Sequence, residues 1–136
     1  MRVIRGREAD QPSDNRTPTA DKATTFTGTV WADVLMAGEE GATVNNVWFA
    51  PRSRTYWHTH DVGQILQVIA GSGFVVTRDG ESEAIRAGDI AWIPAGEEHW
   101  HGGSPDSYLL HTATSIGTTR WLDEVSEADY EKGVGA

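Results

Sequence analysis

The sequence predicts an all-β, single-domain fold of the barrel or sandwich type, with one short helix near the C-terminus. Short runs rich in Val, Ile, Thr, Trp and Phe alternate with Gly, Pro and Asp clusters at intervals of about 8 to 12 residues. A length of 136 residues allows one hydrophobic core and is too short for two ordinary domains. The only helix signal is Ser126 followed by Glu127 and Asp129, the pattern of an N-cap with an acid three residues later.

The predicted strands begin after residue 25 and are separated by turn residues. The Asp-Gly pair within Arg78–Glu81 predicts a hairpin with a primed turn, because both of its central residues tolerate positive φ angles. We expect strands at Phe26–Leu35, Ala42–Ala50, Thr55–His60, Gln64–Ile69, Phe74–Thr77, Glu83–Ile85, Asp89–Ile93, His99–His101 and Tyr108–Thr114.

Residues 1–22 differ in composition from the rest of the chain. They are polar, contain Pro12 and Pro18, and show no apolar period. We therefore expect a flexible N-terminal arm over residues 1–22 and a barrel domain over residues 23–136. The alternative is that part of the arm forms a strand exchanged with a neighbouring subunit, since strand edges favour such pairing.

The charge balance limits the classes of partner. Twenty acidic residues against eleven basic ones give a formal net charge of -9, which disfavours nucleic acid and anionic lipid surfaces. No apolar run approaches the ~20 residues that cross a bilayer, and the charged N-terminus lacks the centre of a secretory signal. We expect a cytoplasmic protein that acts on a small molecule, with neither nucleic acid nor membrane as a partner.

The five histidines fall in three of the predicted strands. Residues two apart in a strand project from the same face, so His58 with His60, and His99 with His101, each present two imidazoles side by side. Neutral imidazole is the commonest protein ligand for divalent transition metals. Because burying several imidazoles together without an organising ion is costly, we expect His58, His60 and His99 to share one ion.

Gln64 is the predicted fourth ligand. It follows a turn at Gly63 and shares one strand face with Leu66 and Val68, so its carbonyl oxygen can face the same ion. The chain has no cysteine, which leaves only nitrogen and oxygen donors. A buried glutamine that only donates and accepts hydrogen bonds is the ordinary alternative.

These residues resemble the two motifs of the cupin superfamily, G-x5-H-x-H-x3/4-E-x6-G and G-x5-P-x-G-x2-H-x3-N. The resemblance implies a double-stranded β-helix, also called a jelly-roll barrel. Three positions depart from the motifs, with Arg52 for the first glycine, Gln64 for the glutamate and Gly103 for the final asparagine. The matching residues are His58, His60, Gln64 and Gly71 in the first motif and Gly88, Pro94, Gly96 and His99 in the second.

The chain more closely resembles the small bacterial cupin hydroxynitrile lyases over about residues 23–131. That resemblance implies one Mn²⁺ or Fe²⁺ per chain, and the reversible cleavage of a cyanohydrin to an aldehyde or ketone plus hydrogen cyanide. We expect Mn²⁺ first, with Fe²⁺, Ni²⁺, Zn²⁺ and Co²⁺ as other candidates. Sets of nitrogen and oxygen ligands bind whichever of these metals is available. The matching stretches are Phe26–Val30, Arg54–Gln64, Pro94–Gly102 and Trp121–Tyr130.

Replacement of the usual glutamate by Gln64 changes the expected chemistry. Three imidazoles and one amide make a neutral shell, which leaves the ion with its full double charge and makes it a stronger Lewis acid. The same change removes the carboxylate that many cupin dioxygenases use as a base. Oxygen chemistry is therefore disfavoured, and a lyase is favoured.

Three further residues are the main candidates for catalysis. His101 shares the inward face of His99 and can take or return a proton, because the pKa of a histidine lies near neutrality. His111 has the parity of an inward residue, and the resembling family also has a histidine there. Thr55 matches a family position near the metal and offers a hydroxyl for a substrate oxygen. Asn45 lies on an inward row and is a weaker candidate, more typical of a structural hydrogen bond.

Several alternatives to the lyase remain open on the sequence. An isomerase or lyase acting on a sugar-derived keto acid would need a basic residue facing the interior, for which Arg54 and Arg120 are the nearby candidates. A dioxygenase is a third possibility. In a cupin that binds a small molecule without catalysis, protein ligands would occupy all the coordination positions of the metal.

The six tryptophans are many for this length. Trp57 and Trp100 flank the inward histidines and are expected to point outward, into a second layer or a subunit interface. Such Trp-rich outer faces agree with a homodimer or a higher homo-oligomer.

Overall fold

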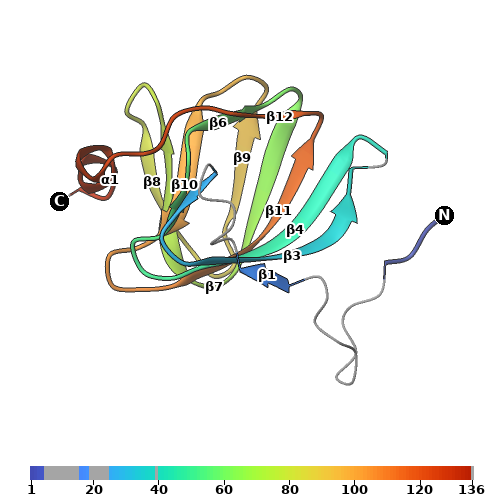
Figure 1. The fold of residues 1–136 in the computed structure, drawn as a ribbon, viewed down its shortest axis with the longest axis horizontal. Coiled ribbons are helices and arrows are strands. Elements are labelled where there is room, and N and C mark those ends of the chain that lie inside the picture. Colours follow the sequence, from blue (N-terminus) through green and yellow to red (C-terminus); the bar gives the residue numbers. More distant parts are fainter. Residues whose placement is uncertain (5–15, 19–24, 39, 136) are drawn as a thin grey trace.

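The computed structural model describes residues 1–4, 16–18, 25–38 and 40–135. Two antiparallel layers of strands pack face to face into a barrel, and one short helix lies at one end (Figure 1). This architecture confirms the all-β fold with a short C-terminal helix. Within the described residues, no helix is long and apolar enough to span a membrane.

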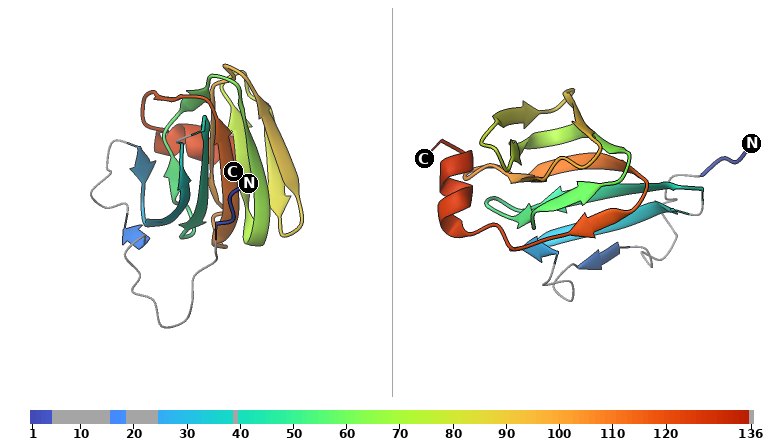
Figure 2. Two further views of the ribbon diagram at one scale, coloured as in Figure 1. Left: turned by 90° about the vertical axis from the view of Figure 1, so that its right-hand side faces the viewer. Right: turned by 90° about the horizontal axis from the view of Figure 1, so that it is seen from above.

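The first layer contains β1, β3, β4, β11, the N-terminal half of β7 and β9. The second layer contains the C-terminal half of β7 with β8, β10, β5, β6, β2 and β12, and Figure 2 shows the two layers from the side. The strands are β1 Arg16–Pro18, β2 Phe26–Thr27, β3 Val30–Ala37, β4 Ala42–Phe49, β5 Arg54–Thr55, β6 His58–His60, β7 Gly63–Thr77, β8 Ser82–Arg86, β9 Ile90–Pro94, β10 His99–Gly103, β11 Leu109–Ile116 and β12 Thr119–Trp121.

Strand β7 runs through both layers and joins them. The sequence predicted two strands, Gln64–Ile69 and Phe74–Thr77, but the structure has one strand of 15 residues. The prediction was wrong because Gly71 was taken as a break. Gly71 instead bends the strand at a φ of 76°, at a point where an added Cβ would lie 2.0 Å from the carbonyl oxygen of Tyr108.

The predicted hairpin joins β7 to β8, but its turn is not of the primed type. Gly80 has a φ of 101°, whereas Asp79 is not among the described residues with positive φ. The loop closes with Thr77 N donating to Glu81 O at 2.8 Å, and the Thr77 hydroxyl donates to the Asp79 carboxylate. These local bonds pair the polar groups of the turn. A four-residue loop, unlike a two-residue primed turn, does not require a second residue with positive φ.

The main core lies between the two layers and consists of the inward aliphatic and aromatic residues of β3, β4, β7, β8, β9 and β11. A second core lies between the outer surface of the second layer and α1 (Glu127–Gly133). Trp57 and Trp100 point into this second core, as their parity predicted. Ser126 caps the helix by accepting from Asp129 N at 3.0 Å, which confirms the predicted start.

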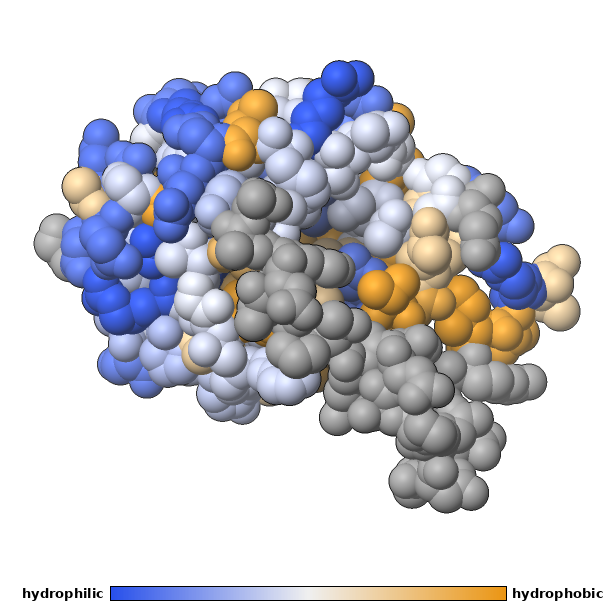
Figure 3. Space-filling view, in the orientation of Figure 1, coloured by the Kyte–Doolittle hydropathy of each residue, from blue (hydrophilic) through white to orange (hydrophobic). Residues whose placement is uncertain are grey.

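Arg54 ties α1 to the second layer. Its side chain is 2% exposed, donates to Val125 O at 2.8 Å and lies over the Tyr130 ring. The Tyr130 hydroxyl donates to Gly103 O at 2.8 Å. The outer surface behind the histidine strands is therefore fixed by buried hydrogen bonds. Figure 3 shows mainly hydrophilic residues around α1 and, at the opposite side, hydrophobic ones near the N-terminal residues 1–4 and the end of β3.

Within the predicted N-terminal arm, Arg16–Pro18 forms β1 and pairs with β3 of the same chain. Residues 5–15 and 19–22, which make up most of the arm, lie outside the described residues. The division into a flexible arm and a barrel domain therefore stays a prediction.

Candidate metal centre

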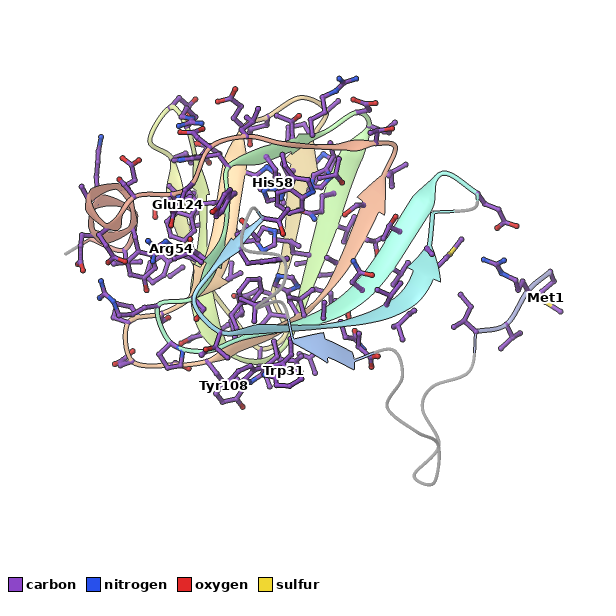
Figure 4. All side chains as sticks on the ribbon, in the orientation of Figure 1. Met1, Trp31, Arg54, His58, Tyr108 and Glu124 are labelled. Atoms are coloured by element: carbon purple, nitrogen blue, oxygen red, sulfur yellow. The ribbon has the colours of Figure 1, made fainter. Side chains whose placement is uncertain are left out.

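Three histidines converge between the layers from two adjacent strands. His58 and His60 lie on β6, and His99 lies on β10 opposite His58. One ring nitrogen from each lies within 4.8 Å of the other two. All three side chains are buried, and Figure 4 shows His58 inside the barrel. The predicted grouping of these three residues is thus present in the fold.

The outer nitrogen of each ring has a hydrogen-bond partner that sets its orientation. His58 Nδ1 lies 2.8 Å from Tyr56 O, and His99 Nδ1 lies 2.9 Å from Glu97 O. Because a carbonyl oxygen only accepts, each of these Nδ1 atoms carries the proton. His60 Nδ1 lies 2.9 Å from the Thr119 hydroxyl. His58 and His99 therefore have their Nε2 lone pairs facing inward, the arrangement typical of metal-binding histidines, and His60 has the same arrangement when its Nδ1 donates to the Thr119 hydroxyl.

Gln64 turns its carbonyl oxygen toward the same point. It lies on β7 opposite Ser115, and Gln64 Nε2 donates to Ser115 Oγ at 3.0 Å. Its Oε1 lies 3.0 Å from His99 Nε2. A neutral His99 has one N–H for two acceptors, the Glu97 carbonyl and the Gln64 amide oxygen. With the proton on Nδ1, the contact between His99 Nε2 and Gln64 Oε1 joins two acceptors and is repulsive unless both bind a cation.

A buried atom without a partner supports the same conclusion. His60 Nε2 is buried and has no hydrogen-bond partner among the described residues. Leaving such a group unsatisfied costs about 1–3 kcal/mol, which an ion bound by the same nitrogen offsets. The donor set therefore fits a divalent transition metal held by His58, His60, His99 and Gln64.

Burial keeps these imidazoles in the neutral form that binds metals. Desolvation lowers the pKa of His58 well below its usual value, with neighbouring histidines adding to the effect. Burial likewise lowers the pKa of His60, and it lowers the pKa of His99 to about 4. Among the residues that the structure describes, no carboxylate belongs to this metal-binding group. The protein ligands are then neutral at pH 7.

A second imidazole pair lies beside the first group. His111 Nε2 lies 2.9 Å from His101 Nδ1, and both side chains are buried. The His101 ring centre is 5.3 Å from that of His58. Desolvation lowers the pKa of His101 well below its usual value, and burial lowers the pKa of His111 to about 4. The pair therefore shares one proton along its hydrogen bond, and neither ring is charged at pH 7.

The outer nitrogens of this pair have no partner among the described residues, namely His101 Nε2 and His111 Nδ1. When His101 Nδ1 donates to His111, the lone pair of His101 Nε2 is free to accept a proton. The structure thus brings the two predicted histidines into hydrogen-bond contact and leaves one ring nitrogen of each without a described partner.

Thr55 and Asn45 also lie near this pair. Thr55 is 1% exposed, and its hydroxyl accepts from His101 N at 3.3 Å, so it fixes the backbone of His101. Asn45 lies opposite Ala113, and its Oδ1 is buried without a described partner. The sequence instead predicted a structural hydrogen bond for Asn45, and its Oδ1 makes none with the described residues.

The sequence did not identify Ser115, Thr119 and Trp121 as site residues. Ser115 has the parity of His111 and Ala113, so extending the alternation of that strand by one more inward residue would have found it. Thr119 and Trp121 lie on β12, a strand of three residues that follows Gly117 and is too short to show a period.

Loss of the Thr119 hydroxyl is expected to weaken metal binding, because it positions His60. We expect Thr119→Val to lower the affinity for Mn²⁺ about 10- to 100-fold, the range found for residues that orient metal ligands. Calorimetric titration of the metal-free protein measures the effect. Thr59→Val, on the outer face between His58 and His60, is the matched control and should bind as the native chain does. Equal affinities for all three proteins would contradict the assigned role.

The comparisons with known proteins agree with the fold. The model of the cupin domain matches residues 46–108. The (R)-mandelonitrile lyase of Granulicella tundricola is 38% identical over 113 residues, which are 79% of this chain and 86% of that protein.

Two solved structures show the same fold. A cupin-like protein from Thermotoga maritima has a TM-score of 0.78 and 34% identity, covering 93% of this chain and 97% of the other. A polyketide cyclase from Streptomyces resistomycificus has a TM-score of 0.59 and 23% identity, covering 75% and 76% of the two chains, and shows the fold alone. The converging histidines, the barrel and these relatives together establish that the chain belongs to the cupin family.

Proposed function

We propose that the chain is a manganese-dependent carbon–carbon lyase of the hydroxynitrile lyase type, which reversibly cleaves a cyanohydrin into an aldehyde or ketone and hydrogen cyanide. The observation that carries this proposal is a neutral ligand set next to a buried, uncharged imidazole pair. The relative named (R)-mandelonitrile lyase supports the same reaction class.

A divalent ion bound to His58, His60, His99 and Gln64 would supply Lewis acidity toward a substrate hydroxyl, undiminished by any carboxylate ligand. The chain itself supplies the orientation of its ligands, through Tyr56 O, Thr119, Glu97 O and Ser115. These contacts hold the ligand atoms in place before substrate arrives, which reduces reorganisation during the reaction.

His101 takes the proton of the substrate hydroxyl at Nε2. The bond between the hydroxyl-bearing carbon and the nitrile carbon then breaks, its electron pair leaves with cyanide, and a carbonyl group forms. His101 returns the proton to cyanide, which leaves as HCN. His111 stabilises the transiently charged ring by accepting from His101 Nδ1. Because burial lowers the pKa of His101, the ring is in its base form at neutral pH and gives up the proton readily.

The observations give less support to the alternatives. Arg54 is held under α1, and Arg120 is exposed and paired with Asp61 at 3.0 Å, so neither supplies a cation to the interior for a keto acid. The ligand set lacks the carboxylate base of many dioxygenases. A site that only stores a ligand does not need the free nitrogens of the His101–His111 pair.

The direct test is cleavage of racemic mandelonitrile by the manganese-loaded protein, followed as benzaldehyde release. We expect His101→Ala to lower the rate about 10²- to 10⁴-fold, the usual contribution of a general base. Metal content and circular dichroism of the variant, together with a His101→Gln variant that keeps the side chain polar, show whether the fold is intact. Absence of benzaldehyde above the His101→Ala background would overturn the proposal.

The Gln64→Glu variant tests whether a neutral set of metal ligands is important for catalysis. The Ser115 hydroxyl can donate to a carboxylate, so we expect the variant to fold and to bind Mn²⁺ at least as tightly as the native chain. The added negative charge weakens the Lewis acidity, and we expect kcat to fall by about tenfold or more. A variant with unchanged or higher kcat would show that shell neutrality is unimportant.

We also propose that the chain forms a homodimer through the outer face of its first layer. Trp31 and Trp48 are paired neighbours on this face, and the Tyr108 ring stacks on Trp48 with 6.4 Å between centres. Figure 4 shows Trp31 and Tyr108 at the lower edge of the barrel. Ile90 and Trp92, 67% and 56% exposed, continue the apolar surface on β9.

The size of this face suits a second copy of the chain. Five strands about 4.8 Å apart, four with about eight residues at 3.3 Å and the shorter β9, cover roughly 600 Å². A stable interface buries about 800 Å² on each partner, and β1 can supply part of the difference. A two-fold arrangement then covers the same residues on both chains.

Sedimentation equilibrium at micromolar concentration tests the dimer. We expect twice the chain mass for the native protein and a shift to monomer for Trp92→Glu, which places a charge in the buried face. Leu122→Glu, a substitution at a 38% exposed residue directly after β12 of the other layer, is the control and should remain dimeric. A native protein that is only monomeric at these concentrations would contradict the proposal.

A further inference from the structure

A groove opens between β8 and β9, the two strands that end the two layers on the same side of the barrel. β8 pairs only with the C-terminal half of β7, and β9 pairs only with its N-terminal half, so each has a free edge within the described residues. Figure 2 shows these two strands at one side of the barrel. The groove has a volume of about 380 Å³, and none of the five histidines lines it. It is therefore separate from the candidate metal centre.

The floor of the groove is apolar. Val75, Ile85 and Ile93 line it, and all three are buried members of the main core. Ile90 and Trp92 line its outer side, where both are exposed. These last two residues also belong to the outer face of the first layer that is assigned to the homodimer. The groove is therefore continuous with that face.

The rim of the groove is acidic. Glu83 lies opposite Val75 on β8, so the two side chains share the inward face. Glu81, Asp89 and Glu97 line the same groove from outside the two strands. No lysine or arginine lines it, and no ion pair among the described residues involves Glu81, Glu83 or Glu97. Four carboxylates thus surround an apolar floor.

Protection of the free strand edges does not account for the whole arrangement. An inward-pointing charge on an edge strand prevents pairing with another chain, which accounts for Glu83. Glu97 lies on neither strand, and it adds a further negative charge to the same groove. Like charges that converge repel one another, and a cation between them removes the repulsion. The groove therefore favours an occupant that is both apolar and positively charged.

The N-terminal segment of the chain has this chemistry. Residues 1–7, Met-Arg-Val-Ile-Arg-Gly-Arg, contain three arginines and no acidic residue, in a chain whose net charge is -9. Val3 and Ile4 are 57% and 44% exposed, so neither is buried against its own barrel. Figure 1 shows residues 1–4 beyond the ends of the strands. The segment and the groove are thus complementary in charge and in apolar character.

The order of strands favours the segment of a second copy over the chain's own segment. β1 and β9 lie at opposite edges of the first layer, five strand spacings of about 4.8 Å apart. In the homodimer, a two-fold axis parallel to the strands brings β1 of one copy over β9 of the other. The eleven residues between Ile4 and β1 can span at most about 40 Å, enough to reach the groove from there. A chain's own segment would have to cross the outer face that the dimer covers.

We propose that Met1–Ile4 of a second copy bind in the groove between β8 and β9, with Val3 and Ile4 on the apolar floor and Arg2 beside the acidic rim. The inference rests on the homodimer and is independent of the reaction that the site performs. β1 stays paired with β3 of its own chain, so only the residues before it cross to the other copy. The N-terminal segment then helps to hold the two copies together.

The test is cross-linking between two copies that each carry a single cysteine, because the native chain has none. Full-length Val3→Cys with a C-terminal mass tag is mixed with full-length Glu83→Cys, and a short bismaleimide is added. We expect a product that contains one chain of each kind. It should form about tenfold faster or more than with the control chain, since a bound segment has an effective concentration in the millimolar range. The matched control is Glu124→Cys, at an exposed acid that follows β12 on the other side of the second layer.

A charge reversal tests the contact with the acidic rim. We expect Arg2→Glu, introduced into the Val3→Cys chain, to slow the cross-linking about threefold or more, because it brings a like charge to the rim. Arg2 is exposed, so the substitution leaves the barrel unchanged. An unchanged rate would contradict the placement of Arg2.

Sedimentation of the same mixtures separates the possible failures. Cross-linking no faster than with Glu124→Cys, in a protein that sediments as a dimer, would overturn the inference and leave the dimer standing. A link that forms only within a chain carrying both Val3→Cys and Glu83→Cys would assign the groove to the chain's own segment and would also overturn the inference. A native protein that is only monomeric would overturn the dimer and the inference together. Cyanohydrin cleavage enters none of these measurements, so a failure of the proposed reaction is detected separately.

Discussion

The inward orientation of the imidazole Nε2 lone pairs is the constraint on which the candidate centre depends. Carbonyl oxygens of Tyr56 and Glu97 fix the protons of His58 and His99 on the outer nitrogens. The Gln64 oxygen then faces a second acceptor 3.0 Å away. An arrangement of converging acceptors in a buried place is unfavourable by itself and becomes favourable with a cation. The hydrogen-bond pattern thus favours a cation at this point.

The barrel supplies this pattern through strand register. β7 passes from one layer to the other, so it carries Gln64 at one end and pairs with the histidine strand β10 at the other. The second core and Arg54 fix the back of the same strands against α1. Because both faces of the histidine strands are packed, the ligand atoms have little freedom to turn away from one another.

Much of the centre could be predicted from residue spacing, because a two-residue period fixes which side chains share a face. That argument placed His58 with His60 and His99 with His101, but it gave no distance between His101 and His111 on different strands. It also took Gly71 as a strand end, since sequence does not show whether a glycine bends or breaks a strand. Trp121 was missed as a site residue because β12 has only three residues, and its position follows from pairing with β6.

The central claim concerns four protein atoms around one ion, and anomalous diffraction at the manganese absorption edge tests it most directly. Crystals of the manganese-loaded chain should show one ion per chain, bound by Nε2 of His58, His60 and His99 and by Oε1 of Gln64. An ion bound elsewhere, binding through an Nδ1 atom, or a Gln64 oxygen turned away from the ion would contradict the account.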